Sequence, residues 1–165
     1  MSNVRILTHP EQTPEPLPDH ARQTMQEQFQ SFCLRRTGAR PYQFAGREVA
    51  HVTGWNETSH LWHEINLFRD NQGRFVVDLR VFKKSTADQD MFHVVMVDSI
   101  DEAAAWLENY DPQQDVKVDI DFDGNTASMA EIALQAADLQ LRILDAKRQY
   151  AAIVGDLFYA LRLSV

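Results

Sequence analysis

The sequence predicts an α+β fold, in which an antiparallel sheet of four to five strands forms a meander flanked by helices. Three observations indicate this class. Apolar residues repeat every two positions in the middle of the chain, but every three to four positions near both ends. The links between the alternating stretches, 54–59 and 70–73, are far too short for crossover helices. The stretch 126–163 has no proline and one glycine, as expected of a long helix.

The N-terminal region divides into a tail and a helix. Residues 1–18 hold four of the six prolines, so they are predicted to form a flexible tail, and 19–165 a single domain. Asp19 is a suitable N-cap for a helix, which Gly38 and Pro41 end. The apolar residues at helical spacing are Ala21, Met25, Phe29, Phe32 and Cys33. Cys33, the only cysteine, is therefore predicted to be a small core residue rather than a nucleophile.

Four strands are expected in the middle of the chain, at 44–53, 60–68, 74–82 and 91–97. Their apolar residues suggest a register that places the large side chains on one face. The predicted pairs are Leu67 with Phe75, Ile65 with Val77, Leu61 with Val81, Val77 with Val95 and Val81 with Met91. His63 and His93 then lie on the buried face, too far apart to share a metal, so we expect them to be hydrogen-bonded core residues.

The opposite face of this sheet is the candidate ligand-binding site, formed by Trp62, Glu64, Asp78 and Arg80. In the predicted register Glu64 lies directly opposite Asp78, and two facing carboxylates need a cation or a shared proton. Such a pair is used for acid–base chemistry or cation capture. The alternative interpretation is structural, with Arg80 pairing with both carboxylates and holding a wet sheet face together.

A short helix and a fifth strand are expected after the meander. Ser99 and Glu102 fit a capping box that begins the helix, and Asp111-Pro112 ends it. Residues 116–122 alternate strictly between apolar and charged side chains, which predicts a strand with one buried face.

The net charge of −8 originates in one segment, 98–123, which has nine carboxylates and a single cation, Lys117. One side of the protein should therefore carry a negative field that repels nucleic acid and membranes and attracts basic partners. The candidate partner-binding residues are Asp101, Glu102, Glu108, Asp119, Asp121 and Asp123. The run 119–124 imitates a calcium loop but lacks the glutamate at its twelfth position, so no metal or cofactor is predicted.

The helix at 126–163 carries an apolar seam at alternating steps of four and three, which predicts a homodimer formed through this helix. The predicted seam residues are Ile132, Leu139, Ile143, Tyr150, Ile153 and Leu157. Two alternatives stay open. The helix could break between 145 and 155 and fold back on itself, or it could pack internally on the sheet.

The motifs of common enzymes are absent from the sequence: there is no glycine-rich phosphate loop, no G-x-S-x-G elbow and no H-E-x-x-H helix. The single cysteine and the lack of an apolar leader or spanning stretch favour the cytoplasm. We therefore expect a non-enzymatic binding protein, of the inhibitor, immunity or chaperone-like adaptor kind, that presents an acidic surface to a basic protein. The competing hypothesis is a small-molecule-binding domain or small enzyme centred on Glu64 and Asp78.

Overall fold

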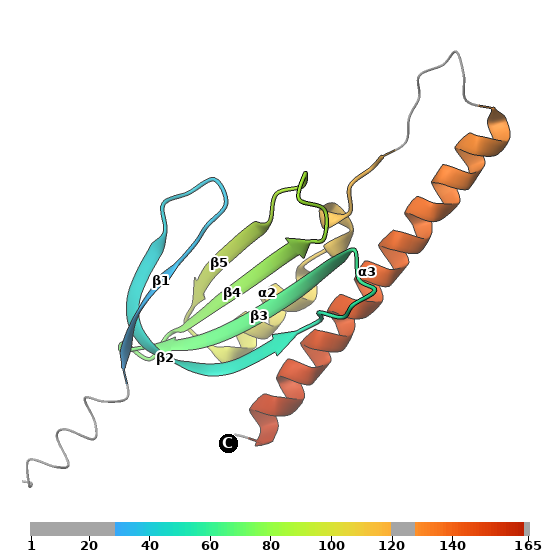
Figure 1. Ribbon diagram of the computed structural model, residues 1–165. Helices are drawn as coiled ribbons and strands as arrows, with labels where there is room; N and C mark the ends of the chain where they lie inside the picture. Colours follow the sequence, from blue (N-terminus) through green and yellow to red (C-terminus); the bar gives the residue numbers. More distant parts are fainter. Residues whose placement is uncertain (1–28, 120–127, 164–165) are drawn as a thin grey trace, which may run out of the picture.

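The computed structural model describes residues 29–119 and 128–163 and has an α+β fold (Figure 1). Its sheet has five antiparallel strands in the order β1-β2-β3-β4-β5, which is the predicted meander. The strands are β1 (Gln30–Leu34), β2 (Tyr42–Thr53), β3 (Leu61–Asp70), β4 (Phe75–Lys83) and β5 (Met91–Val97). The fold class and the antiparallel sheet are therefore confirmed.

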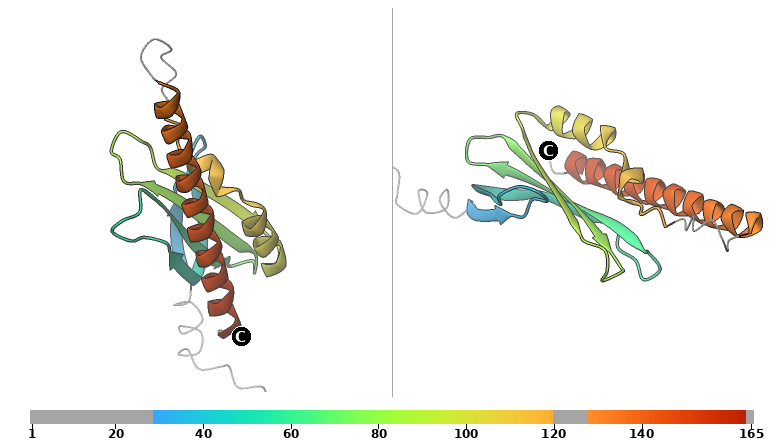
Figure 2. Two further views of the ribbon diagram at one scale, coloured as in Figure 1. Left: turned by 90° about the vertical axis from the view of Figure 1, so that its right-hand side faces the viewer. Right: turned by 90° about the horizontal axis from the view of Figure 1, so that it is seen from above.

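Among the described residues, three helical elements follow the sheet: α2 (Ile100–Asn109), the 3₁₀ turn η1 (Pro112–Asp115) and α3 (Met129–Leu163). Helix α3 contacts β2 and β3, while α2 contacts β4 and β5, so both helices cover the same face of the sheet (Figure 2). Helix α3 is longer than the sheet, and its first half extends beyond the strands (Figure 1).

The main core lies between this covered face and the two helices. Ile65, Leu79 and Leu107 are among its fully buried residues, and Tyr150 and Leu157 of α3 complete it. These strand residues alternate along β3 and β4, as side chains that share one face of a sheet must. Burial of the C-terminal half of α3 is thus what fixes the helix on the domain.

The other face of the sheet holds a second, smaller core because the sheet curls. Phe68 and Val76 are buried there, against the Phe32 and Phe44 rings of the first hairpin. The loop after β1 reaches the far edge strand, where the Thr37 amide donates to the Phe92 carbonyl over 2.9 Å. Bonds to this loop partly cover the exposed edge of β5, which would otherwise be free to pair with another strand.

The register between β3 and β4 differs from the prediction by two residues: Leu67 pairs with Val77 and Ile65 with Leu79, instead of Phe75 and Val77. The Asp70 carboxylate causes the shift, because it accepts hydrogen bonds from the Gln72 and Arg74 amides. The ladder therefore continues to Asp70, whose amide donates to the Arg74 carbonyl. A three-residue turn remains, closed by Gly73 at φ +86°. The pairs of β4 with β5, Val77 with Val95 and Val81 with Met91, are confirmed.

The N-terminal prediction is wrong where it can be compared. Phe32 and Cys33 belong to strand β1, which pairs with β2, and not to a helix. Apolar residues at 29, 32 and 33 fit helical spacing, yet pairing with Phe44 and packing on Phe68 favour a strand. Cys33 is exposed, so it is not a core residue. The predicted tail 1–18 and the earlier part of the helix lie outside the described residues.

The strand predicted at 116–122 is not formed over 116–119, which have no strand pairing, and 120–122 lie outside the described residues. The fifth strand of the sheet is β1 instead. Helix α3 is continuous from Met129 to Leu163, so the alternative of a break between 145 and 155 is wrong. Ser128 and Glu131 form the predicted capping box, since the Glu131 amide donates to Ser128 Oγ and the Ser128 amide to Glu131 Oε2.

Candidate functional site

The four predicted ligand-binding residues do lie together, on the face of the sheet that the helices leave uncovered. In the observed register Glu64 pairs with Arg80, and Asn66 pairs with Asp78. The directly opposed carboxylates that suggested acid–base chemistry are therefore replaced by an opposite-charge pair. Trp62 pairs with Phe82, and their rings stack with centroids 5.4 Å apart.

Asp78 is the unusual member of this group, because its carboxylate is almost completely buried. Arg80 Nε donates to Asp78 Oδ2 over 2.8 Å, and Asn66 Nδ2 approaches the same oxygen at 3.3 Å. Asp78 Oδ1 has no partner among the described residues. Burial raises the pKa of the Asp78 carboxyl, and the attraction of Arg80 offsets only part of this effect. Arg80 therefore pairs with Asp78, as the structural interpretation expects, but forms no ion pair with Glu64. One oxygen of the Asp78 carboxylate is left without a hydrogen bond.

A buried polar network lies on the opposite, helix-covered face. His63 Nε2 is 2.8 Å from Asp115 Oδ2, and both side chains are fully buried. The Tyr110 hydroxyl donates to both oxygens of Asp115, over 2.8 and 2.9 Å, and also lies 3.5 Å from His93 Nε2. Burial, followed by the repulsion of Asp115, raises the pKa of the Tyr110 hydroxyl, so it remains a proton donor. The expectation that His63 is a hydrogen-bonded core residue is confirmed.

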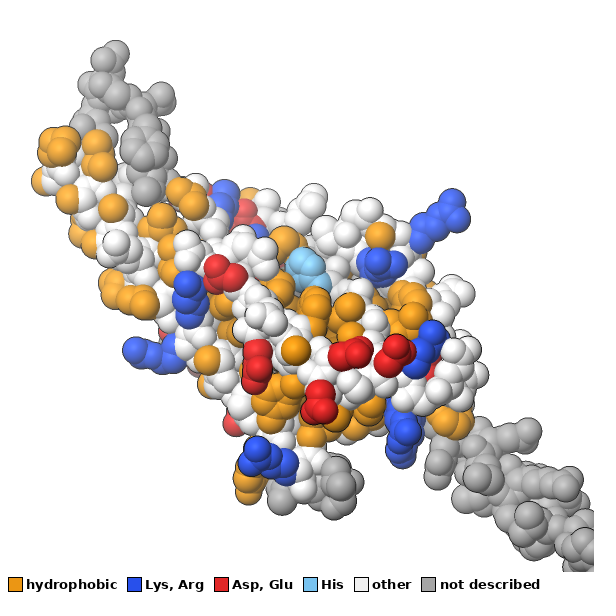
Figure 3. All heavy atoms as spheres, turned by 180° about the vertical axis from the view of Figure 1, so that it is seen from behind, with side chains coloured by type: hydrophobic (Ala, Val, Ile, Leu, Met, Phe, Trp, Pro, Cys, Tyr) orange, Lys and Arg blue, Asp and Glu red, His pale blue; other side chains and the backbone are white. Residues whose placement is uncertain are grey.

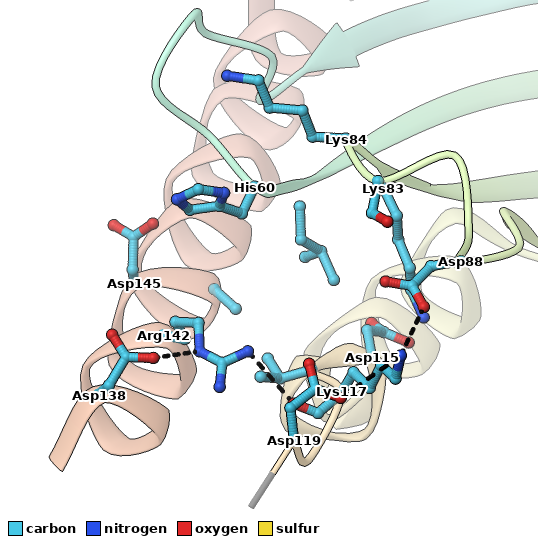
Figure 4. Close-up of a pocket in the computed structure, with 14 residues that line it drawn as sticks. His60, Lys83, Lys84, Asp88, Asp115, Lys117, Asp119, Asp138, Arg142 and Asp145 are labelled. Atoms are coloured by element: carbon cyan, nitrogen blue, oxygen red, sulfur yellow. Dashed lines mark hydrogen bonds and ion pairs between the residues drawn. The ribbon is translucent and has the colours of Figure 1, made fainter. Parts of the chain in front are cut away.

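A cavity of about 520 Å³ opens above this network, between η1, α3 and the loops that join β2 to β3 and β4 to β5. Asp115 is one of its lining residues. Figure 4 shows five basic side chains around it: His60, Lys83, Lys84, Lys117 and Arg142.

Several charges of the cavity are already paired with one another. Lys117 Nζ lies 3.2 Å from Asp88 Oδ1 and 3.4 Å from Asp119 Oδ1, and hydrogen bonds to these two carboxylates raise the pKa of the Lys117 amine. Arg142 Nε lies 3.0 Å from Asp138 Oδ2 (Figure 4). Self-neutralisation of this kind reduces the field that the cavity offers to a charged ligand.

Three of the six carboxylates predicted to bind a partner lie on α2. Asp101, Glu102 and Glu108 are all exposed on this helix, and the view from behind shows carboxylates gathered over it (Figure 3). Asp119 is also exposed and lies at the cavity, beside Lys117. Asp121 and Asp123 lie outside the described residues.

Helix stability explains some of these carboxylates and not others. Ser99 Oγ accepts from the Glu102 amide, and Glu102 Oε2 accepts from the Asp98 amide, which is the predicted capping box. Asp101 lies in the first turn, where negative charge is favourable. Glu108 lies near the carboxyl end of α2, where no basic residue occupies the last turn. Negative charge is unfavourable there, so the helix itself gives no reason for Glu108.

The predicted dimer seam is largely internal. Tyr150, Ile153 and Leu157 are buried in the core of their own chain, so the prediction that they form an intermolecular seam is wrong. The apolar periodicity was consistent with either partner, and the sheet supplies the matching surface. Ile132, Leu139 and Ile143, in the half of α3 beyond the strands, are partly buried, and their role in association stays a prediction.

Sequence reasoning missed two features of the structure. The first is Asp115, which belongs to the acidic segment but is the buried partner of His63. The apolar residue Val116 beside it is the one feature of the local sequence that indicates burial. The second is a row of exposed leucines on α3, Leu134, Leu141 and Leu144, which was overlooked because the opposite seam has more apolar residues.

Comparison with known proteins gives no relative: no protein-family model matches the chain, and neither does any curated protein or solved structure. Within 29–119 and 128–163, no group of three or more His, Cys, Asp or Glu side chains could hold a metal ion. None of the described helices has both the length and the apolar character needed to cross a membrane.

Proposed function

We propose that this chain is a cytoplasmic, non-enzymatic binding protein that presents the surface of α2 to a basic protein partner. One observation carries the proposal: five exposed carboxylates lie between residues 98 and 111, and the same stretch has no lysine or arginine. These residues are Asp98, Asp101, Glu102, Glu108 and Asp111. Clustered charge of one sign speeds the association of oppositely charged proteins and selects against partners of like charge.

Glu108 strengthens this proposal because its position is unfavourable for the helix. Of the carboxylates on α2, Glu102 completes the capping box and Asp101 favours the helix start, but Glu108 opposes the helix dipole. A residue that destabilises its own element and is exposed is better explained by an interaction outside the chain. Inhibitor, immunity and adaptor roles all use such a surface.

The test compares capture of partners by the full chain and by a variant with a neutralised surface. Asp101→Asn combined with Glu108→Gln removes two charges without touching the capping box. A partner should bind the natural chain at about 0.05 M salt, dissociate at about 0.5 M, and bind the variant at least about tenfold more weakly. The matched control is Glu57→Gln combined with Asp156→Asn, which removes the same charge from two exposed positions outside α2. Equal binding by both variants would contradict the proposal.

A second candidate function is small-molecule binding at Trp62, Glu64, Asp78 and Arg80. The observation that favours it is the buried Asp78 Oδ1 without a partner, since a ligand that donates a hydrogen bond would satisfy this oxygen. Binding of this kind should be nearly indifferent to salt, which separates it from capture through α2. Loss of such binding in Asp78→Asn, with the fold retained, would establish this alternative.

A further inference from the structure

Helix α3 has a second apolar stripe, on the side opposite the sheet. Its residues recur at steps of three and four, and each of them is exposed. This outer stripe consists of Ala130, Leu134, Ala137, Leu141, Leu144, Arg148, Ala152, Gly155 and Tyr159. Apolar side chains along the part of α3 beyond the sheet are visible in Figure 3.

The exposure of this stripe is large for apolar residues. The exposed fractions are 72% for Leu134, 66% for Leu141, 60% for Leu144 and 67% for Tyr159. From residue 130 to residue 159 the stripe is about 44 Å long. Isolated exposed leucines are common on proteins, but an aligned row over this length indicates an interaction surface.

Gly155 is the residue that indicates another helix. It lies in the interior of α3, where glycine is less favourable than alanine. A Cβ added at this position would have no atom within 4 Å, so packing within the chain does not require glycine. Close approach by a backbone or a bulky side chain from another molecule would require it. The neighbouring stripe residue Ala152 is also small.

Size varies along the stripe in a way that fits a second copy of the same helix. Small and bulky residues alternate along it: Ala130 and Ala137 lie among the leucines of its first half, and Ala152 and Gly155 precede Tyr159 in its second half. An antiparallel pair of identical helices brings the start of each against the end of the other, so Leu134 faces Gly155 and Tyr159 faces Ala130, while Leu141 faces Arg148 near the centre. A self-complementary patch of this kind generates a closed twofold dimer.

We infer that this protein forms an antiparallel homodimer through the outer stripe of α3, with the twofold axis near Leu144. In this arrangement Leu134 of one copy lies against Gly155 of the other, and Ala137 against Ala152. Leu144 meets its own counterpart at the axis. The two sheets then lie on opposite outer sides of the helix pair, because each sheet covers the other face of its α3.

The charges near the stripe favour binding of α3 from a second copy over binding of a lipid surface. Arg148 interrupts the apolar row, and Asp145 lies beside it one turn earlier. In the antiparallel dimer Arg148 of each copy comes within a turn of Asp145 of the other, so the charges alternate across the axis. A membrane offers no such acceptor at the apolar level, where a cation in the middle of the apolar face is unfavourable.

The first experiment measures the mass of the full chain by sedimentation equilibrium at concentrations up to about 0.1 mM. The natural chain should be a dimer, and Gly155→Leu should weaken dimerisation at least about tenfold, because the leucine fills the space that the second helix occupies. Its monomer should fold normally, since that space is empty within one chain. The matched control is Gln140→Leu, an added leucine on an exposed position of α3 outside the stripe, which should leave the dimer unchanged.

Cysteine cross-linking tests the direction of the helices in a Cys33→Ser background. Leu144→Cys lies at the proposed axis and should cross-link to itself, whereas Leu134→Cys alone should not. Leu134→Cys mixed with Gly155→Cys should form the mixed pair. Efficient self-linking of Leu134→Cys would mean parallel helices and overturn the inference. A monomeric natural chain, including one that binds vesicles of zwitterionic phospholipid, would also overturn it, as would a dimer that Gly155→Leu leaves intact.

Discussion

His63 and Asp115, 52 positions apart in the chain, meet in the core with 2.8 Å between His63 Nε2 and Asp115 Oδ2 and no exposure of either side chain. The contact joins strand β3 to the 3₁₀ turn η1. Tyr110, at the end of α2, donates to the same carboxylate. The turn η1, which follows α2 in the chain, is thereby held to the sheet by a carboxyl group with no exposed surface.

Removal of Asp115 should therefore destabilise the protein strongly. Asp115→Ala leaves His63 and the Tyr110 hydroxyl buried without their acceptor, and we expect a loss of about 3–5 kcal/mol in the free energy of unfolding. Urea denaturation measures this quantity. The matched control is Glu108→Ala, an exposed carboxylate on the neighbouring helix, which should change stability by no more than about 0.5 kcal/mol. A loss below about 1 kcal/mol for Asp115→Ala would show that water reaches the pair.

Helix α3 offers a matched pair of tyrosines that tests how it docks. The buried Tyr150 hydroxyl donates to the Leu107 carbonyl over 2.8 Å, and burial raises the pKa of this hydroxyl. Tyr150→Phe should cost about 1–2 kcal/mol in thermal or urea unfolding, because the Leu107 carbonyl loses its side-chain donor in the core. Tyr159→Phe, on the exposed side of the same helix, should cost less than about 0.5 kcal/mol. Equal losses of stability in the two variants would contradict the assignment of Tyr150 to the buried face of α3 and of Tyr159 to its exposed face.

The sheet was predictable because its signal is local. Alternation of apolar residues and short links placed four strands within a few residues of their observed bounds. Register depends on less visible chemistry: the Asp70 side chain lengthened one hairpin ladder, and that shift separated Glu64 from Asp78. Strand β1 was mistaken for a helix because its identity depends on contacts with Phe44 and Phe68, which are distant in sequence.

In the candidate sites, too, some features can be predicted from the local sequence and others depend on contacts between distant residues. The exposed carboxylates of α2 were predictable from charge and helical periodicity alone. The His63–Asp115 pair was not, since apart from the apolar Val116 beside it nothing local distinguishes this buried aspartate from its eight acidic neighbours in the 98–123 segment. Periodicity also identified an apolar face on α3 correctly but could not decide whether the sheet or another chain covers it. That decision depended on where the sheet lies.

The Asp70 turn should make stability depend on pH in the acid range. Burial alone would raise the pKa of the Asp70 carboxyl, but hydrogen bonds from Arg74 and Gln72 lower it below its ordinary value of 3.8. Because the pKa is lower in the folded state, the ionised carboxylate contributes to the free energy of unfolding. This contribution is complete above the pKa of the unfolded state and is lost as pH falls through the pKa of the folded state.

We expect Asp70→Ala to lose about 1–3 kcal/mol near pH 7, because two backbone amides and the Arg74 guanidinium lose their acceptor. The difference in the free energy of unfolding between the natural chain and Asp70→Ala should stay constant down to about pH 4 and become smaller at lower pH. Urea unfolding at several pH values measures it. Asn71→Ala, an exposed neighbour in the same turn, is the control and should show a small difference that does not vary with pH. A difference that grew on acidification would contradict the assignment.

Asp78→Asn decides between the structural and the ligand-binding interpretation of the uncovered sheet face. Because burial raises the folded-state pKa of Asp78, ionisation disfavours the folded state, and this cost develops as pH rises from about 4 through the raised value. Asparagine imitates the neutral acid, so the variant should be as stable as the natural chain below about pH 4 and at least as stable at pH 7.

The structural interpretation predicts that Asp78→Asn keeps or gains stability at pH 7 and binds protein partners as the natural chain does. Loss of a bound small molecule in native mass spectrometry of the variant, with the fold intact, would instead assign Asp78 to a ligand site. A loss of more than about 1 kcal/mol at pH 7 would show that the Arg80 pair outweighs the burial of the carboxylate.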